Sequence, residues 1–283
     1  MEKGGGVLML ENCFFCGGEV REWGVVKASR IEKCLECGGG KTVGENGMSG
    51  KDGYHRDEVY AEEEGLFQNI FKRRVRLIER FKKRGRVIEV GCSTGVLLEL
   101  MKKKGWEVVG VEPSKKACGV ARGKGIEVIE GRFEDFKGKE ERFDVVIFNH
   151  VLEHVTDPIE VLKEARRLLV KDGLVFVDVP NFGSWSAKLL GVSWPYVLPE
   201  EHKWHFTKEA MFALFKRAGL AVEHYETRSG VWDYGEPLKE MWESLRGGKK
   251  RFFGEAVGLV PNWIASQFGG GTSLTAIGKK YEK

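Results

Sequence analysis

The 283-residue sequence contains no apolar run long enough to cross a bilayer, which takes about 20 residues. The first ten residues also lack the longer apolar stretch of a secretory signal, so we expect a cytoplasmic protein. Charge of one sign is not in excess, because 46 lysines and arginines face 42 aspartates and glutamates, a formal net charge of +4. Such a balance does not by itself imply a nucleic-acid partner.

Cysteines are few but grouped: four of the six form the pairs Cys13-Phe-Phe-Cys16 and Cys34-Leu-Glu-Cys37. In a reducing compartment such pairs suggest a metal rather than disulfides. Two glycines follow each pair and permit the tight turn that brings two thiolates to one ion. The duplication argues against a thioredoxin-like redox motif, which would be expected once. We therefore expect residues 11–39, which resemble zinc ribbons, to hold a structural Zn²⁺ through these four cysteines.

The rest of the chain divides into a linker and one large domain. Residues 40–56 are rich in glycine and are predicted to be a flexible linker. Residues 57–283 alternate short apolar runs with amphipathic segments, which predicts a parallel sheet with right-handed crossovers. Strands are expected at 25–31 in the cysteine-rich module and at 87–90, 107–111, 126–129, 143–148, 174–179, 221–225 and 273–277. Helices are expected at 57–83, 96–104 and 114–122, and after the capping residues Asp157 and Thr207.

The most informative stretch is Val87-Ile-Glu-Val-Gly-Cys-Ser-Thr-Gly95, where a buried strand enters a loop of small residues before a helix. Small residues let the backbone approach a ligand closely. A dinucleotide fingerprint GxGxxG is absent, because Ser93 and Val96 stand where its second and third glycines would be. A carboxylate, Glu89, lies within the strand two residues before the loop.

This stretch resembles the nucleotide loop of class I S-adenosylmethionine-dependent methyltransferases, E/D-x-G-x-G-x-G, with Ser93 in place of the middle glycine. The resemblance extends over residues 66–283 and implies an α/β fold, a Rossmann-like seven-stranded sheet with helices on both faces. It also implies binding of S-adenosylmethionine at the loop. The residues implied there are Glu89, Gly91, Cys92, Ser93 and Gly95.

The same resemblance assigns further cofactor residues. Glu112 ends the second strand of the domain, where the family's acidic residue accepts both ribose hydroxyls, and Pro113 follows it. The third strand is followed by Gly131-Arg-Phe-Glu-Asp135, and either Glu134 or Asp135 would lie near the adenine amine. We take Glu134 as the candidate.

Histidines supply the candidate catalytic groups. Methyl transfer from a sulfonium is a direct displacement, and a general base helps where the acceptor must lose a proton. The stretch from Phe143 to His154 resembles the family's fourth-strand motif and places Asn149 and His150 beside the methionine part of the cofactor. His150 is the first candidate base, with a role in orienting the loop as the alternative. His202 is the second, and His154 is expected to pack or to hydrogen-bond locally.

Three interpretations of the acceptor remain open. We favour a small molecule, because residues 181–207 follow the fifth strand and contain Trp194, Tyr196 and Trp204, which could line a pocket or belong to the core. An RNA or protein acceptor, gripped by the ribbon and by the basic face of helix 57–83, is the alternative. A non-catalytic S-adenosylmethionine-binding module is the third. The Pro-Pro-aromatic and Pro-Cys motifs of nucleic-acid methyltransferases are absent.

Overall fold

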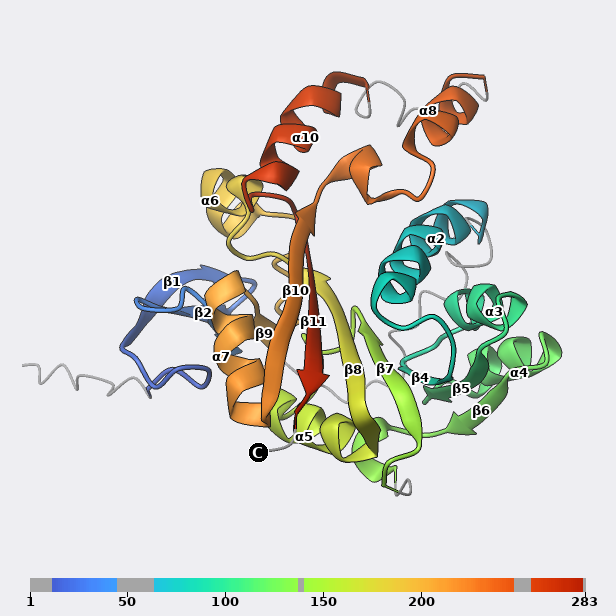
Figure 1. Cartoon of the computed structure of the whole chain (residues 1–283). Coiled ribbons are helices and arrows are strands. Elements are labelled where there is room, and N and C mark those ends of the chain that lie inside the picture. The colour runs from blue at the N-terminus through green and yellow to red at the C-terminus, as the bar shows by residue number, and fades with distance from the viewer. Residues whose placement is uncertain (1–11, 45–63, 137–139, 247–255, 282–283) are drawn as a thin grey trace, which may run out of the picture.

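The computed structural model describes residues 12–44, 64–136, 140–246 and 256–281, which form two sheets (Figure 1). The smaller sheet has the order β1-β2-β3-β9, and the larger has the order β10-β11-β8-β7-β4-β5-β6. The strands of the smaller sheet are β1 (Val20–Val26), β2 (Ser29–Cys34), β3 (Gly40–Val43) and β9 (Trp204–His205). Those of the larger sheet are β4 (Arg86–Val90), β5 (Glu107–Glu112), β6 (Glu127–Glu130), β7 (Phe143–Asn149), β8 (Leu169–Pro180), β10 (Leu220–Arg228) and β11 (Ser273–Lys280).

The seven-stranded sheet is the one predicted from the sequence. Its strands from β8 to β6 are parallel, and β11 runs antiparallel between β8 and β10. The chain proceeds from β4 outward to β5 and β6, and then returns to place β7 on the other side of β4. The strand order therefore reverses between β4 and β7, and open α/β sheets bind ligands at the carboxyl ends of strands at such a point.

Alternation along the strands explains why helices cover both faces. In β7, Val145 and Ile147 pack with α2, α3 and α4, whereas Val146 and Phe148 pack with α5 and α7. Successive strand residues point to opposite faces, so a continuous apolar run needs cover on both sides. These helices are α2 (Glu64–Phe81), α3 (Val96–Lys103), α4 (Lys115–Gly123), α5 (Pro158–Leu168) and α7 (Lys208–Ala218), and the others are α6 (Trp185–Leu190), α8 (Pro237–Arg246) and α10 (Leu259–Gln267). Within the described ranges, no helix combines the length and apolarity that a membrane span requires.

The N-terminal module differs from the prediction at two places. A strand over 25–31 is wrong, because Lys27 and Ala28 have φ of 46° and 65° and form the turn between β1 and β2. The module also continues past residue 39, since β3 begins the predicted linker and pairs with β2. Residues 45–56 of that linker and residues 57–63 of the first predicted helix lie outside the described residues. We call residues 12–44 the ribbon.

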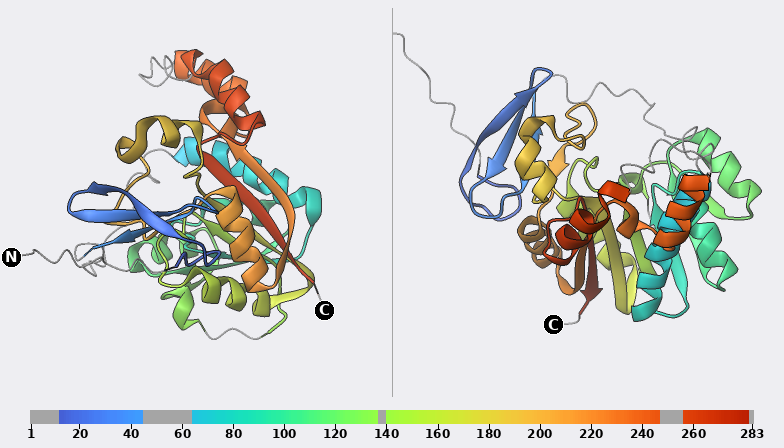
Figure 2. Two further views of the ribbon diagram at one scale, coloured as in Figure 1. Left: turned by 90° about the vertical axis from the view of Figure 1, so that its left-hand side faces the viewer. Right: turned by 90° about the horizontal axis from the view of Figure 1, so that it is seen from above.

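The ribbon is joined to the large domain rather than tethered beside it (Figure 2). Its strand β3 pairs with β9, with Gly40 opposite His205 and Lys41 opposite Trp204. The ring of Phe14 lies 4.4 Å from that of Trp204. A side chain on Gly39 would collide with the ring of Phe15, so the absence of a Cβ there permits the close packing. Aromatic contacts and strand pairing thus fix the ribbon against the segment that contains His202.

Three basic residues of α2 pair with carboxylates of their own chain. Arg74 is 2% exposed and its Nη2 lies 2.9 Å from Oδ1 of Asp178, which is fully buried. Arg73 pairs with Asp233 at 2.8 Å, and Lys72 pairs with Glu236 at 2.9 Å. The alternative that the basic face of α2 contacts an RNA acceptor stays a prediction, because Arg74 is buried in an ion pair whereas Arg76 and Arg80 are exposed.

Candidate functional site

The loop between β4 and α3 has the backbone of a ligand-binding turn. Gly91, Ser93 and Gly95 have φ of 68°, 45° and 75°, all in the left-handed region. A side chain on Gly91 would lie 2.7 Å from Val151, and one on Gly95 would lie 2.5 Å from Ile126. Glycine is the residue that occupies such positions without strain. Ser93 adopts the same left-handed backbone conformation at a cost in free energy. Strained conformations of this kind are kept where the surrounding structure holds them, often at functional sites.

Glu112, at the end of β5, holds this loop in place. Its Oε2 accepts a hydrogen bond from the backbone N–H of Ser93 at 2.9 Å, and its Oε1 accepts one from Ser114 at 2.8 Å. The side chain is 4% exposed. A carboxylate has about four acceptor positions, so a side chain of this kind at the end of β5 is suited to accept ribose hydroxyls as well as backbone N–H groups.

Two further buried acceptors end the neighbouring strands β4 and β7. Oε2 of Glu89 and Oδ1 of Asn149 accept no hydrogen bond from any described residue. Burial, and after it the nearby Glu112 carboxylate, raises the pKa of Glu89 well above its ordinary value. Buried polar atoms without a partner are rare in folded proteins. Both atoms therefore suit a polar ligand bound where the strand order reverses.

The remaining cofactor candidates occupy different surroundings. The side chain of Cys92 is buried in the core, where a Cβ on Gly110 would lie 2.4 Å from its Sγ. The backbone of Cys92 therefore belongs to the loop, whereas its side chain belongs to the core. The spacing of residues in the sequence does not distinguish these two cases. Pro113 follows β5 at the surface, and Glu134 is exposed in the short helix η1 (Phe133–Asp135) after β6.

His150 occupies a strained backbone position directly after β7. Its φ is 55°, and its N–H donates to the carbonyl of Asp178 at 2.8 Å. Its Nδ1 lies 3.3 Å from Glu153 and its Nε2 lies 3.6 Å from the Asp178 carboxylate. Burial lowers the pKa of His150, but these two carboxylates raise it by more, and the net shift is upward. The imidazole is thus held in one orientation between two acids.

His202 lies in the loop before β9 and meets a residue that sequence analysis expected to pack or to hydrogen-bond locally. Its ring centroid is 4.9 Å from that of His154. Burial lowers the pKa of His202 to about 4. Glu153, His154 and His202 each place one potential ligand atom within 4.8 Å of the others. Glu153 was not identified from the sequence, although a Glu-His pair directly after a central strand is a signal that could have identified it.

Two of the three aromatic residues considered for an acceptor pocket belong to the core. Trp194 is 3% exposed and its Nε1 donates to Ser186 at 3.0 Å. Trp204 is 5% exposed and packs against Phe14 of the ribbon. Tyr196 is 40% exposed. Of the two alternatives left open, core packing describes both tryptophans.

The four cysteines of the ribbon are gathered at one point. Sγ of Cys13 lies 3.6 Å from that of Cys37, and Sγ of Cys16 lies 3.5 Å from that of Cys34. All four sulfurs lie within 4.8 Å of one another. Tetrahedral Zn²⁺ with Zn–S bonds of about 2.3 Å separates its sulfurs by about 3.8 Å. The cluster is therefore compatible with one zinc ion.

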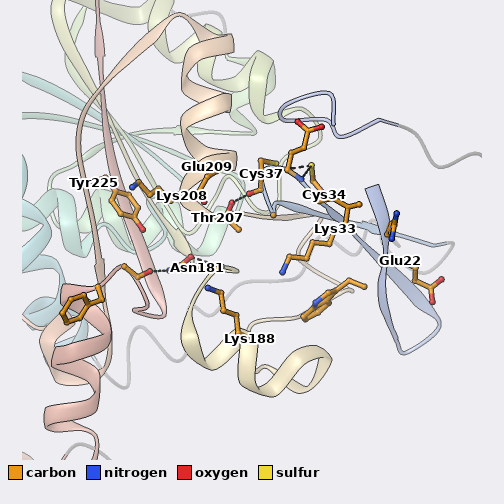
Figure 3. A pocket seen from close by; sticks show the side chains of 18 of the residues that line it. Glu22, Lys33, Cys34, Cys37, Asn181, Lys188, Thr207, Lys208, Glu209 and Tyr225 are labelled. Carbon is orange, nitrogen blue, oxygen red and sulfur yellow. Dashed lines mark hydrogen bonds between the residues drawn. The ribbon is translucent and has the colours of Figure 1, made fainter. Parts of the chain in front are cut away.

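A cavity of about 890 Å³ separates the ribbon from the end of β8 and the start of α7 (Figure 3). Lys33 from β2 and Lys188 from α6 both point into it (Figure 3). Burial, and then the charge of Lys188, lowers the pKa of Lys33. Of the predicted site residues, only Cys34 and Cys37 line this cavity. It is thus distinct from the cofactor loop and from the histidine cluster.

Comparisons with known proteins agree with this geometry. The family model described as a methyltransferase domain matches residues 62–225, more than half of the chain. A ubiquinone biosynthesis O-methyltransferase of Cereibacter sphaeroides is 32% identical over 147 residues, 48% of this chain and 60% of that protein. The C-methyltransferase NovU of Streptomyces niveus is 33% identical over 146 residues, 50% of this chain and 34% of that protein. The matches thus span less than two thirds of each relative.

A solved structure shows the same fold. A SAM-dependent methyltransferase of Thermotoga maritima aligns with a TM-score of 0.55 and 21% identity, covering 80% of this chain and 98% of that one. The matched family segment contains the glycine loop, Glu112 and the end of β7. The prediction made from the loop is confirmed: the chain belongs to the methyltransferase domain family and has the fold of class I S-adenosylmethionine-dependent methyltransferases.

Proposed function

We propose that this enzyme methylates a small molecule, which binds at the junction of two segments beyond the cofactor loop. The junction is the observation that carries the proposal. Residues 150–156 follow β7, residues 198–203 precede β9, and the backbone N–H of Lys203 donates to the carbonyl of Glu153 at 2.8 Å. The close approach of Val151 to Gly91 places this junction against the cofactor loop.

The cofactor residues have separate tasks in this proposal. S-adenosylmethionine supplies a methyl group bound to a sulfonium. Glu112 accepts the ribose hydroxyls, Glu89 and Asn149 receive polar groups of the methionine part, and Glu134 lies toward the adenine. The backbone from Gly91 to Gly95, Cys92 and Ser93 included, permits the close approach. Alignment of the two reactants can supply roughly 7–11 kcal/mol of the barrier.

His150 and His202 contact the acceptor. The imidazole of His150 is held between the carboxylates of Glu153 and Asp178. In this fixed orientation it aligns the acceptor. His202 approaches from the opposite segment, and its Nδ1 is 2.9 Å from the carbonyl of Tyr196. The curated relatives named as an O-methyltransferase of ubiquinone biosynthesis and a C-methyltransferase support an oxygen or carbon atom of a metabolite as the acceptor.

We assign a structural Zn²⁺ to Cys13, Cys16, Cys34 and Cys37. Four thiolates form a closed site without an open position, which is typical of structural rather than catalytic zinc. The ribbon that this ion stabilises reaches the acceptor side, because Thr42 Oγ1 donates to the carbonyl of His202 at 2.7 Å. The ribbon therefore helps to position His202, one of the residues proposed to contact the acceptor.

Labelled S-adenosylmethionine tests the acceptor class. The protein is incubated in parallel with a small-metabolite extract and with cellular RNA, each at low and moderate salt. We expect label in the metabolite fraction at both salt concentrations, and much less of it with Glu112→Gln when the cofactor is below saturation. Phosphate-driven RNA binding falls with salt, with a slope of roughly −0.7 per neutralised phosphate for single strands. Label that enters RNA in a salt-sensitive manner, with none in metabolites, refutes the proposal.

A further inference from the structure

Glu153, His154 and His202 form a compact group that methyl transfer does not by itself explain. Two of the three are buried: Glu153 is 1% exposed and His202 is 6% exposed. One ligand-capable atom from each lies within 4.8 Å of the others. Two imidazoles and one carboxylate at this separation match the donor set of a metal site with open positions.

The buried carboxylate of Glu153 has His150 within ion-pair distance but accepts no hydrogen bond from the described residues. Among the residues that the structure describes, neither of its oxygens accepts a hydrogen bond. Nδ1 of His150 lies 3.3 Å from Oε1, an ion-pair contact without hydrogen-bond geometry. Buried charges in proteins are paired, hydrogen-bonded or bound to a metal. A cation placed between Glu153 and the two imidazoles supplies what this side chain lacks.

Both histidines are held in the tautomer that a metal ligand needs. Nδ1 of His154 is 2.9 Å from the carbonyl oxygen of Glu201, and Nδ1 of His202 is 2.9 Å from that of Tyr196. A carbonyl oxygen only accepts, so each Nδ1 carries the proton and donates it. The lone pair of each ring is then on Nε2. Metal-binding histidines characteristically donate their other N–H to a backbone carbonyl in this manner.

Backbone hydrogen bonds also fix the two segments that carry the group. The carbonyl of Glu153 accepts from the N–H groups of Lys203 at 2.8 Å and Trp204 at 3.2 Å. On the far side, Thr42 of the ribbon donates to the carbonyl of His202 at 2.7 Å. The three side chains are therefore held together before any ion arrives, and preorganised ligands are what a selective metal site requires.

We propose that Glu153, His154 and His202 bind a divalent first-row transition metal ion, distinct from the zinc of the ribbon. Imidazole with carboxylate suits Zn²⁺, Fe²⁺ and their neighbours in that row. Three protein ligands leave positions open, and the group borders the cofactor loop through Val151. An oxygen atom of the acceptor fits such a position, where a metal orients it and polarises it. This last role rests on the proposed function, whereas the metal site itself does not.

Zinc titration of the full-length protein tests the site without any acceptor. Protein whose ribbon holds one zinc per chain is titrated with Zn²⁺ by calorimetry, and bound metal is counted by elemental analysis. We expect a second equivalent in the wild type. Glu153→Gln and His202→Asn lower its affinity by more than the roughly 10–100-fold that loss of an outer partner causes. His224→Asn is the control, because His224 pairs with Glu226 at 3.6 Å on β10 and belongs to no such group.

Retention of the ribbon zinc and of S-adenosylmethionine binding shows that each variant is folded. Cobalt gives a second readout, since Co²⁺ bound by imidazole and carboxylate lacks the thiolate charge-transfer absorption of Co²⁺ in the ribbon. The proposal is overturned if the wild type binds only the ribbon zinc. It is also overturned if Glu153→Gln and His202→Asn each still bind a second Zn²⁺ with wild-type affinity. Label transfer to RNA refutes the proposed function alone, because metal counting needs no methyl transfer.

Discussion

Replacing Arg74 with methionine tests whether the buried ion pair between α2 and β8 stabilises the fold. The guanidinium donates to Asp178 at 2.9 Å, with side-chain exposures of 2% and 0%. The hydroxyls of Ser273 at 3.0 Å and Thr275 at 2.6 Å also donate to that carboxylate. In Arg74→Met these two bonds remain, but the buried negative charge loses its cation. Removing one partner of a buried pair costs about 3–5 kcal/mol, and we expect about 3 kcal/mol here.

The pH dependence gives a second, independent check. Burial raises the pKa of Asp178, but Arg74 and then His150 lower it by more, to about 2 from an ordinary 3.8. At about 1.4 kcal/mol per unit, this depression contributes about 2 kcal/mol. That stability is complete above pH 4 and is lost as pH falls toward 2. Without Arg74 the largest cause that lowers the pKa of Asp178 is gone and the folded pKa rises, so the variant's deficit is smaller at pH 4 than at pH 7.

Urea unfolding at both pH values measures these differences. Lys82→Met is the matched control on the same segment, because Lys82 pairs with Asp144 at 3.2 Å with exposures of 27% and 25%. A pair this exposed contributes about 0–1 kcal/mol. The double variant Arg74→Met/Asp178→Asn removes both charges, and we expect it to recover most of the loss. A cost of Arg74→Met no larger than that of Lys82→Met, or a deficit equal at pH 4 and 7, refutes the reasoning.

Three further predictions concern the cofactor, the ribbon and their junction. Glu112→Gln should weaken S-adenosylmethionine binding about 30-fold, or ~2 kcal/mol, in calorimetry with Glu127→Gln on β6 as the unaffected control; stronger binding of NAD than of S-adenosylmethionine contradicts the assignment. Cys13→Ser should lower tightly bound zinc by one equivalent per chain while cofactor binding persists, and a metal-free wild type prepared without chelator excludes the zinc site. Thr42→Val removes a half-buried donor to His202 and should lower kcat/KM about tenfold at unchanged cofactor affinity; an unaltered kcat/KM would show that the ribbon does not position His202.

Local patterns predicted the large domain well, because its strands are covered on both faces and its loop needs small residues. The run from Phe143 to Phe148 reads as a buried strand, and β7 is Phe143–Asn149. The loop at Gly91–Gly95 has the left-handed backbone that its composition suggests. Such features depend on neighbours within a few residues, so sequence spacing captures them.

Other features depend on partners far along the chain. Charge counting treats every basic residue of α2 alike, but Arg74 is buried because Asp178, 104 positions later, faces it. His154 was expected to pack or to hydrogen-bond locally, whereas its ring lies beside His202 because two loops are joined by hydrogen bonds to Glu153. Periodicity within a helix or strand carries no information about which loops meet.

The pairing of β3 with β9 has a consequence for synthesis of the chain. Thr42 hydrogen-bonds to His202 across 160 positions, and Cys37 accepts from Thr207 across 170. At about 5–20 residues per second, roughly 8–32 s separate the translation of the ribbon from that of the strand on which it docks. During this interval Phe14 and Phe15 have no partner ring from β9. Zinc capture, which needs only residues 13–37, can therefore be completed first, and the acceptor side is the part of the enzyme assembled late.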